Sequence, residues 1–184
     1  AKEFNNGIVI LQGNYIDAKE NGIWKKWDNT GDLIFEGNYV DGEAFGLWKF
    51  YTKGILSSEG NLKTINQEAA EDGPWKYYDT KERVWQEINY VNGEENGLRR
   101  EWYPNGQLRY RGVHKESKQD DICRWFYANG VLKLEQIYDM GLKAGKWQGF
   151  FESGELKWEK VYKANSLVHE KCFDVSGSEI NCSD

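Results

Sequence analysis

The sequence predicts an all-β fold, an elongated single-layer antiparallel sheet made of consecutive β-hairpins. Three observations predict it. One stretch, GLRREWYPNGQLRYRG, joins two short alternating strands through a Pro-Asn-Gly turn. That stretch recurs along the chain with a period of about 24 residues. Aromatic residues make up 15% of the chain, and such large amphipathic rings can cover a sheet that has no second layer.

The repeats are marked by an opening residue, which is Gly22, Gly46, Gly73, Gly97, Asp121, Gly145 and Val168 in turn. Seven aligned positions predict one continuous array rather than separate domains. The expected bounds are a half-repeat at 1–21, full repeats at 22–45, 46–72, 73–96, 97–120, 121–144 and 145–167, and a terminal hairpin at 168–184.

Each segment has an expected form. The half-repeat should provide an edge strand, and its stretch Asn6–Tyr15 could pair with a second copy of the chain. The repeat at 46–72 carries extra residues, KTINQEAAED, which we assign to a longer exit loop. The repeat at 73–96 has Glu82 in place of the turn glycine, so its turn should differ in shape. We expect no helix.

The two faces of the sheet have different compositions. Leu33, Phe35 and Tyr39 share the packing face of their strand, because alternate residues point the same way. A small residue recurs on that face, and a neighbouring ring can lie over it; it is Gly13, Gly37, Gly60 and Gly112. The other face carries lysine or arginine on first strands and glutamate on second strands, which predicts cross-strand ion pairs.

Several classes of function are disfavoured. The formal net charge of −6 argues against general affinity for nucleic acid or for an anionic membrane. The chain has only two histidines, His114 and His169, and no phosphate-binding loop, nucleophile elbow or zinc-spaced Cys/His set. We therefore expect a non-catalytic protein without a cofactor or a metal. His114 takes the place of a tyrosine in other repeats, and we interpret it as a packing residue.

The three cysteines bear on the compartment. Cys123 replaces a tryptophan and is interpreted as a small buried residue. Cys172 and Cys182 flank the last turn, and the sequence leaves open whether they form a disulfide or two thiols. A disulfide would indicate an oxidising compartment. Together with a start in mid-repeat, this favours export slightly, whereas an antitoxin would be cytoplasmic.

The stretches GIWKKWDNTGDLIFEGNYVDG, GLWKFYTKGILSSEGN and GLRREWYPNGQLRYRG resemble the MORN repeat, and specifically its bacterial variant in the YwqK-like antitoxin family. The resemblance covers nearly the whole chain. It implies consecutive hairpins, no enzymatic activity and a binding scaffold, and it suggests an antitoxin that binds and occludes a toxin. The chain departs from the pattern at Arg99 and Cys123, which replace tryptophan, and at Glu82.

Three sets of residues are candidate partner sites. The first is an aromatic strip, which is either core packing or a groove for a peptide or sugar: Trp24, Trp48, Trp75, Trp102 and Trp147. The second is a basic cluster, confined to one hairpin: Arg99, Arg100, Arg109 and Arg111. The third is an acidic rim of exit-loop residues, which would steer a basic toxin: Asp41, Glu43, Glu71, Asp72, Glu94 and Glu95.

The main functional hypothesis is thus a scaffold for a protein partner, most specifically an antitoxin or immunity-type protein. The alternative is an exported surface scaffold that binds peptide, glycan or envelope material through the aromatic groove. Binding of lipid headgroups through the arginines is disfavoured by the net charge.

Overall fold

The computed structural model describes residues 1–182. Over this range the chain consists of β-strands and turns, without a helix, and none of it therefore forms a helix that could cross a membrane. The chain divides into two compact units, Ala1–Glu94 and a second that begins at Glu95. The predicted continuity of the whole array remains a prediction.

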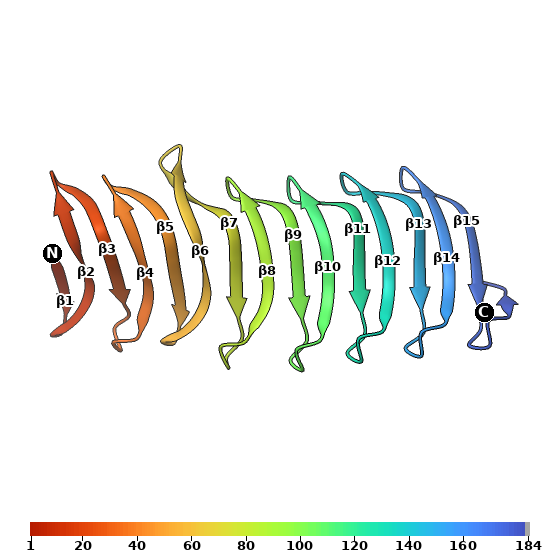
Figure 1. Cartoon of the computed structure of the whole chain (residues 1–184). Coiled ribbons are helices and arrows are strands. Elements are labelled where there is room, and N and C mark those ends of the chain that lie inside the picture. The colour runs from red at the N-terminus through yellow and green to blue at the C-terminus, as the bar shows by residue number, and fades with distance from the viewer. Residues whose placement is uncertain (183–184) are drawn as a thin grey trace. The chain divides into compact units, whose positions relative to one another are not determined.

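In the first unit every strand pairs antiparallel with the next one along the chain (Figure 1). The strands are β1 (Lys2–Asn5), β2 (Ile8–Ile16), β3 (Lys19–Trp27), β4 (Leu33–Val40), β5 (Glu43–Thr52), β6 (Ile55–Ile65), β7 (Glu68–Tyr78) and β8 (Val84–Val91).

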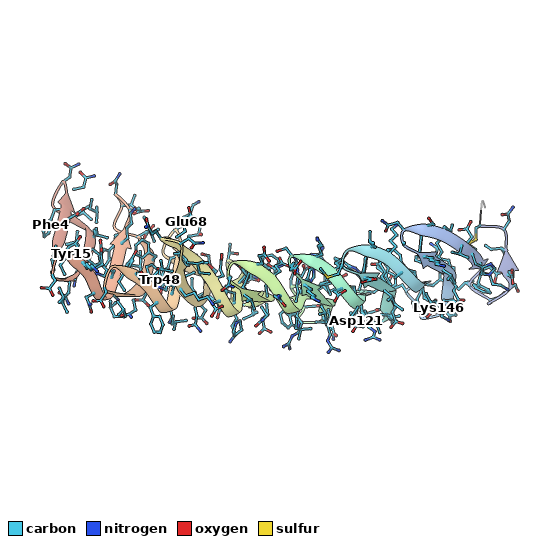
Figure 2. All side chains as sticks on the ribbon, turned by 90° about the horizontal axis from the view of Figure 1, so that it is seen from above. Phe4, Tyr15, Trp48, Glu68, Asp121 and Lys146 are labelled. Atoms are coloured by element: carbon cyan, nitrogen blue, oxygen red, sulfur yellow. A yellow bond between two sulfur atoms is a disulfide. The ribbon has the colours of Figure 1, made fainter. Side chains whose placement is uncertain are left out.

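The second unit repeats this arrangement. Its strands are β9 (Glu94–Trp102), β10 (Leu108–Lys115), β11 (Lys118–Phe126), β12 (Leu132–Asp139), β13 (Leu142–Phe150), β14 (Leu156–Lys163), β15 (Ser166–Phe173) and β16 (Glu179–Ile180). Side chains leave both faces of each ribbon (Figure 2). The predicted all-β class, a single layer of consecutive antiparallel hairpins, is confirmed in both units.

The exit loops are shorter than predicted. Successive hairpins are joined by two-residue turns in which both residues have positive φ, such as Asn92-Gly93 and Glu116-Ser117. Turns of this kind match the twist of the flanking strands. The predicted loop KTINQEAAED is wrong, because its residues extend β6 and β7 to 11 residues each around the turn Asn66-Gln67. Most residues assigned to loops therefore lie in strands.

The N-terminal edge also differs from the prediction. The half-repeat forms two strands, since β1 pairs with β2 through a turn at Asn6-Gly7, with φ values of 49° and 81°. The edge of the first unit is therefore β1, and most of Asn6–Tyr15 is covered by it. The Asn-Gly dipeptide is a hairpin signal that could have revealed this turn.

The turn in the 73–96 repeat keeps the shape of its neighbours, contrary to the prediction. Glu82 has φ 56° and donates its backbone N–H to the Asp79 carbonyl at 2.9 Å, just as Gly31 does to Asp28 at 3.1 Å. The Asp79 carboxylate accepts the backbone N–H groups of Lys81 and Arg83 at 2.8 and 3.0 Å. These bonds hold the turn although glutamate disfavours a positive φ.

The core is a row of indoles seated on glycines. A Cβ built at Gly13, Gly37 or Gly60 would overlap the ring of Trp24, Trp48 or Trp75, one on each. These three rings are 3–4% exposed. The register of the paired strands shifts at each glycine, for example between Glu59 and Asn61. The predicted ring-over-glycine packing is thus confirmed for these pairs.

Candidate partner-binding surfaces

The polar face of the first unit carries one row of residues that alternates in charge from strand to strand. Lys25 Nζ lies 2.8 Å from Glu36, and Lys49 Nζ lies 4.0 Å from Glu59. The hydrogen bond from Lys25 lowers the pKa of Glu36 despite partial burial. We call this row the charge ladder; its members, each opposite the next, are Gln12, Lys25, Glu36, Lys49, Glu59, Lys76 and Glu87.

The same row in the second unit does not alternate throughout. Arg111 on β10 lies opposite Arg100 on one side and Arg124 on the other. Arg124 then pairs with Glu135 at 2.7 Å. The full row is Arg100, Arg111, Arg124, Glu135, Gln148, Glu159 and Lys171. Arg111 therefore stands on a second strand, where the first unit has a glutamate.

The predicted basic cluster does not form one patch. Arg99 binds Glu95 at 3.1 Å and Glu101 at 2.7 Å, and Arg109 lies 3.8 Å from Glu101. Arg100 and Arg111 lie instead opposite each other in the row that corresponds to the charge ladder, and Arg111 also lies opposite Arg124, a residue outside the predicted cluster. The signal for Arg124 was its position in the repeat, which it shares with Lys25, Lys49, Lys76 and Arg100.

A buried polar cluster surrounds His114 in the second unit. His114 is 7% exposed, its Nε2 lies 3.7 Å from Glu95, and burial lowers its pKa. Its Nδ1 has no hydrogen-bond partner in the described part of the chain. Its ring meets Tyr110 edge-on, as expected for a packing residue. Tyr110 donates to Cys123 Sγ at 3.3 Å, and both atoms lie under Gly112, where other repeats seat an indole.

Cys123 is fully buried, which confirms its interpretation as a small core residue. Burial raises the pKa of its thiol, so the thiol is a poor nucleophile. The absence of enzymatic activity remains an expectation.

Four of the five tryptophans of the aromatic strip are core residues, since Trp24, Trp48, Trp75 and Trp147 are at most 5% exposed. The idea of an exposed ladder is therefore wrong for these rings, because each is packed against neighbouring strands. Trp24, Trp75 and Trp147 also donate their Nε1–H to backbone carbonyls at 2.8–3.2 Å. Only Trp102 is half-buried, and a binding role for it remains a prediction.

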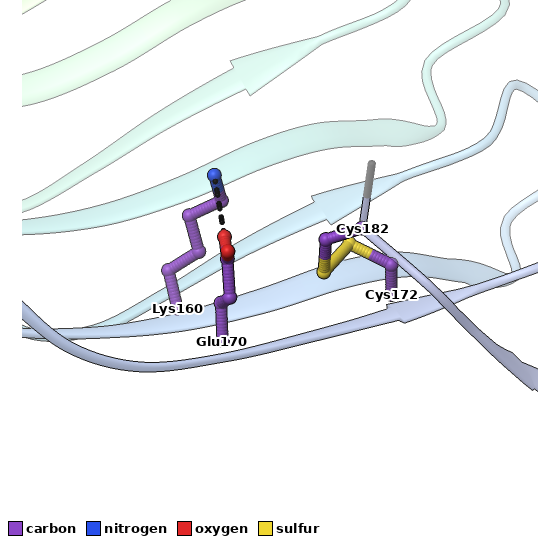
Figure 3. Close-up of a disulfide and its surroundings, with 4 residues drawn as sticks. All are labelled: Lys160, Glu170, Cys172 and Cys182. Atoms are coloured by element: carbon purple, nitrogen blue, oxygen red, sulfur yellow. Dashed lines mark ion pairs between the residues drawn. A yellow bond between two sulfur atoms is a disulfide. The ribbon is translucent and has the colours of Figure 1, made fainter. Parts of the chain in front are cut away.

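An aromatic hollow of about 770 Å³ lies at the C-terminal end of the second unit. Its lining includes Trp147, Trp158, Tyr162, Phe173, Lys157 and Ile180. The disulfide between Cys172 and Cys182 forms one wall, close to the ion pair of Lys160 and Glu170 at 3.1 Å (Figure 3). Lys160 lies opposite Trp147, in the position that Gly37 has opposite Trp24. Because this position holds a lysine instead of a glycine, no further indole packs over it.

An exposed apolar patch on the first unit was not predicted. Ile23, Phe45 and Leu47 are 57%, 61% and 53% exposed, and together they border a hollow of about 490 Å³. The available signal was Phe45, which occupies a position held by Asn21, Asp72, Asn96 and Asp120 in other repeats. An exposed cluster of large apolar side chains is typical of an interaction site.

The predicted acidic rim consists of residues in different settings. Asp41, Glu43 and Glu94 are exposed. Asp72 pairs with Lys63 at 2.8 Å, Glu95 pairs with Arg99, and Glu71 is half-buried within β7. A role for these carboxylates in steering a basic partner remains a prediction.

The comparison with family models agrees with the repeat. The family described as MORN repeat variant matches residues 20–41, 71–92, 95–116 and 122–140. No curated protein matches the chain. Two solved structures are similar in part, a crystal structure of TarM (16% identity) and an S. aureus TarM mutant with Fondaparinux, alpha-GlcNAc-glycerol and UDP (15% identity). Each has a TM-score of 0.35, and the match covers 54% of this chain and 19% of the other chain.

Each matched segment contains the turn of one hairpin, such as Asp28–Asp32 or Asp79–Arg83, with the two strands that this turn connects. Four segments of the chain therefore match the MORN repeat variant.

Proposed function

We propose that this chain is a non-catalytic scaffold that binds a protein partner through the apolar patch of its first unit. The observation that carries the proposal is the exposure of Ile23, Phe45 and Leu47 around one hollow. Phe45 and Leu47 are alternate residues of β5, so they lie on the same face of the sheet.

The energetic argument favours an interface. Burying a large apolar side chain contributes about 1.5–3 kcal/mol. Three such side chains side by side can supply the central, desolvated contact of a protein interface. Lys25, Glu36 and Lys49 border the same hollow and would form a polar rim.

The finer proposal is an antitoxin or immunity-type role, in which the bound partner is a toxin that the scaffold occludes. It is supported by the resemblance of the repeats to the YwqK-like family. A basic toxin would be attracted by the exposed carboxylates of Asp41, Glu43 and Glu94 at low salt.

The test is co-expression of the chain with the product of its neighbouring gene, followed by pull-down and growth assays. The double variant Phe45→Ser/Leu47→Ser should lose at least nine-tenths of the captured partner. The control is Val91→Ser, which changes another exposed apolar residue of the first unit, 44% exposed, and should retain it. Capture of a partner that is not toxic would refute the antitoxin role. Equal capture by the double variant and by Val91→Ser would refute binding through the apolar patch.

The second candidate function is an exported scaffold that binds a peptide or glycan in the aromatic hollow. Two observations favour it: the hollow has the volume of a ligand site, and its wall contains a disulfide, which persists in oxidising compartments. Val175→Trp should fill the hollow and abolish binding on a peptide or glycan array. Val168→Trp changes a residue of similar exposure that does not line the hollow, and should leave binding intact.

A further inference from the structure

The row of the second unit that corresponds to the charge ladder places three arginines in register. Throughout the first unit, each lysine of the ladder lies between glutamates or next to one. Within the second unit, Arg111 instead lies between Arg100 and Arg124. Like charges directly opposite one another destabilise a sheet, so Arg111, with a cation on each side, costs stability unless an anion joins it.

Arg111 is the centre of this row. Its side chain is exposed, and no carboxylate of the described chain pairs with it, whereas Arg124 pairs with Glu135. Glu101 of the same hairpin contacts Arg99 and Arg109. Asp121 is the one acidic residue that lines the shallow hollow shared by Arg111 and Arg124, and its Cα lies opposite Tyr138 rather than in the ladder.

The geometry selects the chemistry of the occupant. Neighbouring strands are about 4.8 Å apart, so the three guanidinium groups are rooted over about 10 Å. At the other positions of the ladder, the group that separates two cations is a glutamate carboxylate. Arginine offers a planar fork that matches carboxylates. An extended peptide places alternate side chains about 7 Å apart, within reach of these long side chains.

The lining of the shallow hollow, about 150 Å³ in volume, adds apolar contact beside the arginines. Leu98, Val113 and Ile122 line it together with Arg111 and Arg124. A peptide can therefore place a small apolar side chain there while its carboxylates meet the arginines. A bare inorganic anion would use only the charges.

We infer that Arg100, Arg111 and Arg124 form a binding site for an extended acidic segment of a protein partner. The inference rests on the proposed scaffold function and names the chemistry of one contact. Arg111 stands at the position where the first unit has a ladder glutamate. The arginine lowers the stability of the sheet at this position and provides the binding site.

The test uses the full chain and a fluorescein-labelled eight-residue Glu-Ala repeat peptide, with binding followed by fluorescence anisotropy. Arg111→Glu restores the alternation of the ladder. It should weaken binding at least about 10-fold and raise the melting temperature by about 2–5 °C, because two unfavourable contacts become favourable. Lys115→Glu is the matched control, since it makes the same charge change on an exposed residue of β10 outside the row. Its affinity should stay within about 2-fold of the parent chain.

Three results would overturn the inference: equal binding of a Gln-Ala peptide, equal losses in the two variants, or a lower melting temperature for Arg111→Glu. Inorganic phosphate that binds at Arg111 while the acidic peptide does not would assign a different ligand and overturn it as well. The partner pull-down described above separates the two proposals. Peptide binding without partner capture would refute the scaffold and leave the site, and partner capture without peptide binding would refute the site alone.

Discussion

Replacing Gly37 by alanine tests the ring-over-glycine packing directly, because two physical effects predict opposite signs. The backbone of Gly37 is not in the left-handed region, and at such a position an added Cβ usually stabilises a protein by about 0.4–1 kcal/mol through the unfolded chain. The packing predicts the reverse, since the new Cβ would overlap the indole of Trp48.

The size of the loss follows from the burial of Trp48. The ring is 4% exposed, and a tryptophan buries about 200 Å². At about 25 cal/mol per Å², complete expulsion of the ring would cost about 5 kcal/mol, while a shifted but retained ring would cost about 1–3 kcal/mol. We expect a net loss of about 2–4 kcal/mol. With an m-value of about 2 kcal/mol/M, the urea midpoint should fall by about 1–2 M.

A double-mutant cycle locates the effect. Trp48→Ala alone should cost about 3–5 kcal/mol. In the Gly37→Ala background it should add less than about 1 kcal/mol, because the ring has already lost its seat. Asn38→Ala, the neighbouring substitution, serves as the control, with an expected change below about 1 kcal/mol. A stabilised Gly37→Ala variant, or additivity within about 0.5 kcal/mol, would refute the reasoning.

Three further predictions concern other sites. Cys182→Ser should speed hydrogen exchange in β15 and β16, because the lost disulfide closes a separation of 10 residues worth about 2–3 kcal/mol of chain entropy; unchanged exchange would contradict this. The Arg83 side chain and backbone N–H groups lower the pKa of Asp79 from 3.8 to about 2, so the stability it contributes is present above about pH 4 and is lost as the pH falls toward 2. Carboxyl NMR should show this midpoint, and Arg83→Met should move it upward, whereas an unmoved midpoint would exclude Arg83 as the cause. Glu101→Gln should lower the free energy of unfolding by about 3–5 kcal/mol in urea, because Arg99 loses a buried charged partner. The more exposed Glu135→Gln should lower it by less than about 1 kcal/mol. Equal costs would show that burial of Glu101 is not the cause.

The sequence predicted the hairpins because turn residues and alternation are local signals, and it predicted the glycine seats because Gly13, Gly37 and Gly60 recur at one position. It misplaced the exit loops, since two-residue turns such as Asn66-Gln67 lack the usual Asn-Gly signal, and positive φ values there are imposed by the paired strands. Local signals also did not show that the opening glycines lie inside strands, at the register shifts.

The candidate sites depended on register, which the sequence alone left open. Lys25, Glu36 and their equivalents were assigned to the polar face from alternation. The meeting of Arg100, Arg111 and Arg124 required the pairing of three strands, and the register shifts change which residues face each other. The exposure of Phe45 depends on pairing in the same way, because the register of β4 and β5 shifts between Glu36 and Tyr39.

The seating of Trp24, Trp48 and Trp75 on glycines of the preceding hairpins has a consequence for how such chains grow and shorten. In the first unit, Gly37 and Trp48 belong to different repeats, so each repeat provides the glycine under the ring of the next one. A whole repeat can therefore be added or removed in line with the others without leaving a ring unseated. At the last hairpins of the second unit, Lys160 takes the position of the glycine and Glu170 that of the next ring, so an ion pair replaces the ring-over-glycine contact there.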